Sequence, residues 1–139
     1  MFDAANRTKD IIIVSGIILV ALVIMFLLAR FDVIRRAEHE FKEGEKFYTF
    51  YKNPDIKKQY YNDKLINKKI TEAEYEMSME DNALKNAYVE YQTVIDLFTP
   101  PESKWVKLSR ARIQEITPLY NVWVESLKQT PETVPKKNK

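Results

Sequence analysis

The residues best suited to chemistry surround the only histidine of this 139-residue chain. His39 stands between Glu38 and Glu40, with Glu43 one helical turn further along. A carboxylate beside an imidazole can ligate a metal ion or transfer protons. Metal sites in helical bundles, however, need Glu-x-x-His pairs on facing helices, and the chain has no second histidine. We therefore interpret His39 as a solvated residue on a helix face.

A run of carboxylates is the second candidate for chemistry. Glu72, Glu76 and Glu80 recur every four residues, with Glu74 and Asp81 beside them. Paired carboxylates can act as catalytic acid and base, but this spacing places them along one helix face, and no signal of a closed pocket accompanies them. We favour a solvated acidic face.

Nucleophilic catalysis and phosphate binding lack their usual residues. Ser103 and Ser109 have no base partner at a recognisable spacing, and the absence of cysteine excludes a thiolate nucleophile. Two glycines are too few for Gly-rich phosphate loops or tight hairpins. The sequence predicts no enzymatic activity, no catalytic or metal-binding residue, no cofactor and no small-molecule substrate.

Lysines interleave with Tyr60 and Tyr61 over residues 57–69, a composition that can stack on single-stranded nucleic acid. Asp55 and Asp63 interrupt the basic character, and the net charge of the whole chain is only +2. We therefore predict a solvated basic face and no nucleic-acid partner. The lysines concerned are Lys57, Lys58, Lys64, Lys68 and Lys69.

Charge is segregated along the chain in three blocks. Residues 52–69 carry six lysines and two aspartates, a net charge of +4, whereas residues 71–81 carry five carboxylates, a net charge of −5. Residues 104–139 carry eight basic and three acidic side chains, a net charge of +5. Opposite blocks can pair within one molecule or between copies, although each exposed pair contributes only ~0–1 kcal/mol.

The element on which the rest depends is a stretch of nineteen uncharged residues, 11–29. At ~1.5 Å per residue it covers roughly 28 Å as a helix, close to the ~30 Å hydrocarbon core of a bilayer. A buried core helix would show a polar face, and a cleaved signal peptide has a shorter apolar core and a small-residue cleavage site. We predict a retained transmembrane anchor through Ile11, Val14, Ile18, Leu19, Val20, Leu22, Phe26 and Leu28.

Three further regions flank this span. Residues 1–10 form a polar leader, residues 30–129 form one small helical domain, and residues 130–139 form a polar, proline-broken tail that we expect to be disordered. Basic residues lie on both sides of the span, so their count does not decide its orientation. The domain is predicted to lie on one membrane surface, on a side that the sequence leaves open.

Helical periodicity runs from the span to about Tyr51, where Asn53-Pro54 ends the first helix. A short helix with a loose end is predicted over 55–69. Thr71 and Glu74 have the spacing of a capping box, which predicts one helix from Thr71 to Phe98.

The remaining helices are predicted from prolines. Thr99-Pro100-Pro101-Glu102 ends one helix and starts the next, because proline is favoured in a first turn behind a threonine cap. Thr117-Pro118 interrupts the last periodic stretch, where proline removes a backbone hydrogen bond. We predict two helices here rather than one kinked helix, and the fold class is all-α.

One region resembles a known family. Ala87-x-x-x-Tyr91-x-x-Val94, a proline-marked turn, and then Trp105-x-x-Leu108-Ser109 resemble the end of one tetratricopeptide repeat and the start of the next. Ser109 replaces the commoner glycine, and the match covers about forty residues. The resemblance implies a tetratricopeptide-like array of helical hairpins, with a generic helical bundle as the alternative.

This resemblance suggests a function. One and a half repeats fall short of the three or so that bury a solenoid's faces, so we expect a protein partner or a second copy to complete the core. The chain is predicted to be a membrane-anchored, non-catalytic adaptor; the alternatives are an envelope chaperone or translocon accessory, and an accessory subunit of a membrane enzyme. Candidate packing and docking residues are Tyr88, Tyr91, Phe98, Trp105, Leu108 and Trp123.

Overall fold

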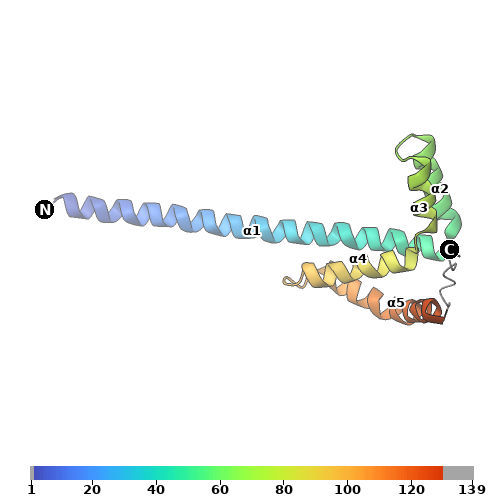
Figure 1. Cartoon of the computed structure of the whole chain (residues 1–139). Coiled ribbons are helices and arrows are strands. Elements are labelled where there is room, and N and C mark those ends of the chain that lie inside the picture. Colours follow the sequence, from blue (N-terminus) through green and yellow to red (C-terminus); the bar gives the residue numbers. More distant parts are fainter. Residues whose placement is uncertain (1, 130–139) are drawn as a thin grey trace, which may run out of the picture.

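The computed structural model describes residues 2–129, and the surroundings of side chains within 12–128. Over this range the fold is all-α and contains no strand (Figure 1), as predicted from the sequence. The predicted disordered tail, 130–139, lies outside the described residues. The helices are α1 (Phe2–Lys52), α2 (Pro54–Ile66), α3 (Glu72–Glu80), α4 (Ala83–Leu97) and α5 (Lys104–Gln129).

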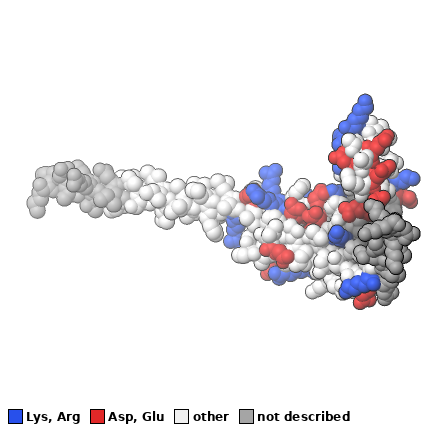
Figure 2. Space-filling view, viewed as in Figure 1, with Lys and Arg blue, Asp and Glu red and all other residues white. Residues whose placement is uncertain are grey.

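Helix α1 is one uninterrupted helix of 51 residues. The apolar stretch in its first half (residues 12–29), which we call the apolar half, is long and apolar enough to cross a bilayer. None of that stretch is buried inside the protein, which argues against a core helix. Figure 2 shows the described part of this stretch as an uncharged rod that leads to a charged body. Exposed anchor positions are Val14, Ile18, Leu19, Val20, Leu22, Phe26 and Leu28, whereas the side chain of Ile11 lies outside the described ones.

The second half of α1 packs with α4 and α5 into a three-helix body. Helix α4 runs back along α1 toward the apolar half, and α5 runs away again beside α4, so the α4–α5 connection lies nearest that half (Figure 1). The core of this body consists of Ala37, Phe41, Tyr48, Leu84, Ala87, Tyr91, Val94, Val106 and Ile116.

Gly44 allows α1 and α4 to approach closely. A Cβ atom at Gly44 would lie 2.7 Å and 2.9 Å from two ring carbons of Tyr91. Real Cβ atoms essentially never come so close, so the ring of Tyr91 occupies the space that any other residue at position 44 would need. The contact therefore depends on this glycine.

The single helix predicted from Thr71 to Phe98 is wrong, because the chain divides there into α3 and α4. Asn82 is the N-cap of α4, and its side-chain oxygen accepts a hydrogen bond from the Lys85 amide at 2.9 Å. Asn86 donates to the Asp81 carboxylate at 2.6 Å. Asp81-Asn82 thus offers side-chain partners that compete with a continuous helix. The predicted capping box at Thr71 is confirmed.

The prediction of two helices around Pro118 is also wrong, since α5 continues through it. The amide that proline lacks would have bonded to the Gln114 carbonyl one turn earlier. Both Pro118 and Gln114 lie on the exposed side of α5, where water can hydrate that carbonyl. The hydroxyl of Thr117 donates to the Ile113 carbonyl at 2.6 Å. A proline on a solvated face therefore costs too little to end a helix that packs on its other side.

Helices α2 and α3 form a hairpin, which we call the arm (residues 54–80), and it stands away from the body (Figure 1). Helix α2 contacts the end of α1, whereas α3 packs along α2 and along no other described helix. As predicted, Asn53-Pro54 ends α1, and Pro54 occupies the first turn of α2.

Candidate protein-docking site

The arm exposes much of its surface within the described chain. None of the nine residues of α3 is buried within the described chain. Ile66 at the end of α2 is 77% exposed and Met77 in the middle of α3 is 62% exposed. A helix normally gains its stability from burying an apolar face, so the arm is built as if a further surface were to cover it.

An aromatic cluster joins the arm to the body. The ring of Phe50, near the end of α1, lies 5.2 Å from the ring of Tyr60 and 6.0 Å from that of Tyr61. Tyr60 and Tyr61 meet edge to face at 5.2 Å. Aromatic pairs at such distances contribute ~0.5–1.5 kcal/mol beyond the area that they bury. The middle of α2 is therefore firmly attached to the end of α1.

Lys57 joins the two helices of the arm. Its ammonium group donates to the carbonyl oxygens of Met79 at 3.0 Å and Asp81 at 2.7 Å, and the side chain is buried. A cation at a helix C-terminus stabilises carbonyls that lack helical partners. Burial lowers the pKa of Lys57, while the charge of Asp81 opposes that effect. The prediction that Lys57 belongs to a solvated face is therefore wrong.

The other charges of the arm form no ion pair with one another among the described residues, and Glu74 accepts hydrogen bonds from Thr71 in the capping box. Among the described residues, no ion pair joins a lysine of α2 to a carboxylate of α3. Lys64 instead lies over the ring of Tyr60, 4.5 Å from its centroid. Figure 2 shows blue and red side chains along the arm. Lys58, Lys68, Lys69 and the carboxylates of α3 are therefore exposed to solvent, whereas Lys57 is buried and Lys52 pairs with Glu115 at 3.8 Å.

A polar cluster ties the three helices of the body together. The guanidinium of Arg112 donates to Glu45 at 2.6 Å and 3.0 Å and to Glu115 at 2.8 Å. Tyr91 donates to Glu45 at 2.6 Å, and Tyr48 donates to Glu115 at 2.7 Å. These bonds join α1, α4 and α5, so the cluster sets their mutual register.

The charges within this cluster compensate one another. Burial alone would raise the pKa of Glu45, but the hydrogen bonds from Arg112 and Tyr91 outweigh it, and the net pKa is lowered. Burial and the bond to Glu45 raise the pKa of Tyr91. An ionised Glu45 and a neutral Tyr91 suit a permanent hydrogen bond, which favours a structural role over catalysis.

Comparison of the chain with protein-family models, with curated proteins and with solved structures finds no match. The tetratricopeptide-like resemblance thus stays a prediction, and the site is interpreted from its own geometry.

The docking residues predicted from the sequence fall into different environments. Tyr91 is fully buried in the core, and Trp105 is half-buried with its ring 5.5 Å from that of Phe41. Phe98 packs at the edge of the core, whereas Leu108 is exposed. Tyr91, Trp105 and Phe98 thus serve packing.

Tyr88 and Trp123 meet through a residue that was not singled out as a docking candidate. Tyr120 stacks on Tyr88 at 4.3 Å and lies 5.5 Å from Trp123. All three are half-buried, and together they line one edge between α4 and α5. The three-residue spacing of Tyr120 and Trp123 on one helix was the available signal. Their stack forms a second, smaller surface with aromatic character.

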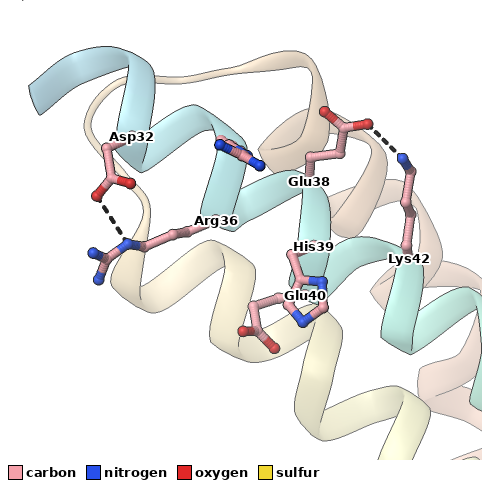
Figure 3. Close-up of a pocket in the computed structure, with 7 residues that line it drawn as sticks. Asp32, Arg36, Glu38, His39, Glu40 and Lys42 are labelled. Atoms are coloured by element: carbon pink, nitrogen blue, oxygen red, sulfur yellow. Dashed lines mark ion pairs between the residues drawn. The ribbon is translucent and has the colours of Figure 1, made fainter. Parts of the chain in front are cut away.

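The side chain of His39 is exposed on α1 and lines a shallow hollow of about 450 Å³ (Figure 3). Glu38 pairs with Lys42 at 2.6 Å and Asp32 pairs with Arg36 at 2.9 Å, so two nearby carboxylates already have partners. Within residues 12–128 no group of three His, Asp or Glu side chains is placed to hold a metal ion.

The serines differ in burial. Ser109 is fully buried, and its hydroxyl has no hydrogen-bond partner among the described residues. The hydroxyl of Ser103 accepts from the Val106 amide at 3.4 Å, near the start of α5. Among the described residues, neither hydroxyl is hydrogen-bonded to a side chain that could act as a general base.

Proposed function

We propose that this chain is a membrane-anchored, non-catalytic adaptor whose arm docks a protein partner or a second copy of itself. The apolar half of α1 is retained as a single-pass anchor, and the three-helix body carries the arm on the far end of that helix. The role is binding rather than catalysis, because the polar side chains of the cluster in the body are hydrogen-bonded to one another.

The observation that carries the proposal is the arm itself: no residue of α3 is buried within the described chain, and among the described residues no ion pair joins a lysine of α2 to a carboxylate of α3. The lysines of α2 and the carboxylates of α3 have opposite signs on neighbouring helices. Two arms placed antiparallel would each set a basic face against an acidic face, which is the self-complementary contact of a two-fold dimer. A second copy is therefore the occupant that we favour.

Charge exchange tests the docking. In the first variant Glu72→Lys, Glu76→Lys and Glu80→Lys reverse α3; in the second Lys58→Glu, Lys68→Glu and Lys69→Glu reverse the basic side. Each variant is prepared in two forms with different tags, and the two forms are purified together in mild detergent. Neither variant should co-purify with itself as well as the native chain does, whereas a mixture of the two should pair, because the opposite charges then meet again.

A matched control reverses Glu125 and Lys128, exposed charges of α5 that lie off the arm, and should leave pairing unchanged. If the first variant pairs with itself as well as the native chain does, the arm does not hold copies together. If arm reversal instead removes a fixed, stoichiometric second protein, the occupant is that protein, and a mixed client list would favour the chaperone alternative. A native chain that is monomeric and co-purifies with nothing would leave the adaptor without support.

The anchor has its own test. The native chain should resist extraction from membranes by alkaline carbonate, and Leu19→Arg with Val20→Arg should release it, since each central arginine costs ~2.5–3.5 kcal/mol of insertion free energy. Release of the native chain would contradict the anchor and leave a signal sequence as its explanation.

A further inference from the structure

A groove lies where the apolar half of α1 meets the body. We call it the neck groove; it has a volume of about 400 Å³. One wall is formed by Phe26, Ala29, Arg30 and Val33 of α1. The other wall is formed by Pro100, Pro101 and Glu102 of the α4–α5 connection, the part of the body closest to the apolar half (Figure 1). Its lining is therefore hydrocarbon except for one guanidinium and one carboxylate.

The two charges in this groove are not equivalent. Glu102 accepts a hydrogen bond from Arg110 at 2.6 Å, so its charge is already compensated from within the body. Arg30, in contrast, has no ion-pair partner among the described residues. The neck groove thus sets an unpaired guanidinium at the end of an apolar wall.

The surroundings of the groove resemble a membrane interface. Phe31 is 66% exposed and Leu97 is 71% exposed, next to the two walls. Half-buried Trp105 follows shortly after, with the ammonium of Lys104 4.9 Å from its ring centroid. Figure 2 shows basic side chains gathered where the uncharged half of α1 enters the body. Aromatic rings beside cations are typical of the headgroup region of a bilayer.

Resting on the proposed anchor, we propose that the neck groove binds an anionic phospholipid of the surrounding bilayer. One acyl chain lies along Phe26, Ala29 and Val33 beneath the two prolines, and the phosphate pairs with Arg30. Phe26 and Ala29 end the apolar segment, so the groove opens at the depth where hydrocarbon gives way to headgroups. A guanidinium suits a phosphate because its fork donates two parallel hydrogen bonds.

Lipid is favoured over a partner helix by continuity and charge. The groove continues the surface that the anchor already presents to lipid, and its single unpaired charge is positive. A basic side chain near a membrane surface favours anionic lipid by about fivefold.

The test measures which lipid remains bound. The full chain is reconstituted into vesicles of equimolar phosphatidylcholine and phosphatidylglycerol, extracted gently, and examined by native mass spectrometry. The native chain should retain phosphatidylglycerol over phosphatidylcholine by about fivefold. Arg30→Gln should abolish this preference, and Val33→Trp should displace the lipid by filling the groove while every charge is kept.

The matched control is Arg36→Gln, because Arg36 lies on the same helix but pairs with Asp32 at 2.9 Å and does not line the groove. It should keep the preference. An undiminished preference in Arg30→Gln, an equal loss in Arg36→Gln, or a stoichiometric protein in place of lipid would each overturn the proposal. Carbonate extraction of the same vesicles separates the two levels: a chain that is extracted has no anchor, whereas one that stays inserted without lipid preference has an anchor and no lipid site.

Discussion

The contact between Gly44 and Tyr91 yields the sharpest prediction, and Gly44→Ala is the perturbation. The new Cβ would lie 2.7 Å from a ring carbon that cannot easily retreat, because the ring is fully buried and its hydroxyl is bonded to Glu45 at 2.6 Å. Overpacking of this kind costs ~1–3 kcal/mol. The better helix propensity of alanine returns ~1 kcal/mol. The net range is ~0–2 kcal/mol, and we expect a loss near its middle, about 1 kcal/mol in the free energy of unfolding.

The assay is urea unfolding of the full chain in detergent micelles, followed by circular dichroism at the helical band and by tryptophan fluorescence. Trp105 reports the body directly because its ring packs on Phe41. Gly16→Ala is the matched control, since a Cβ there meets nothing within 4 Å, and the midpoint should not fall. A Gly44→Ala chain as stable as the native one would refute the reasoning, because it would mean that α1 and α4 do not approach as described.

Three further outcomes are expected. Ser109→Ala should raise the free energy of unfolding by about 1 kcal/mol in the same assay, because it removes a buried hydroxyl that has no partner among the described residues. Lys57→Met should speed amide hydrogen exchange in α3 while exchange in α4 is unchanged, since only α3 loses bonds to its terminal carbonyls. Burial and the neighbouring Glu40 raise the pKa of Glu90 from 4.5 to about 7. Folding therefore favours the protonated carboxyl of Glu90, whose contribution to the free energy of unfolding is full below pH 4.5 and is lost as the pH rises through 7. Glu90→Gln should therefore stabilise the body at pH 8, by about 1 kcal/mol after allowance for solvent screening, and leave stability at pH 4 unchanged; a gain equal at both pH values would contradict the shift.

The sequence predicted correctly those features of the fold that depend on residues close together in the chain. The length of α1, its end at Asn53-Pro54 and the capping box at Thr71 each depend on neighbours within four residues in the sequence. The exposed character of His39 also followed from its immediate surroundings.

The remaining features depend on contacts between distant segments. Pro118 stays within a helix because it faces water while α5 packs on α4, and no local signal gives that orientation. Lys57 is buried because α3 folds back along α2 and offers carbonyl oxygens more than twenty residues away. The neck groove needs Pro100 and Phe26, more than seventy residues apart in the sequence, to line the same hollow. The break at Asp81-Asn82 is different, since its capping signal was present but outweighed by the periodicity on both sides.

Because α1 continues without a break from the apolar half into the body, it fixes the distance between the two. From Arg30 to Lys52 it rises about 33 Å at ~1.5 Å per residue. The arm begins at the far end of that distance, so with the proposed anchor in a bilayer, anything bound to the arm would be held at a set height above the membrane rather than tethered on a loose linker. An insertion into this helix changes both the distance of the body from the apolar half and its rotation about the helix axis. One residue inserted near Arg35 would move the body by only ~1.5 Å but rotate it by about 100°. Seven residues would move it by about 10 Å and nearly restore its original orientation. Partner geometry at this membrane would then be tuned by the length of one helix.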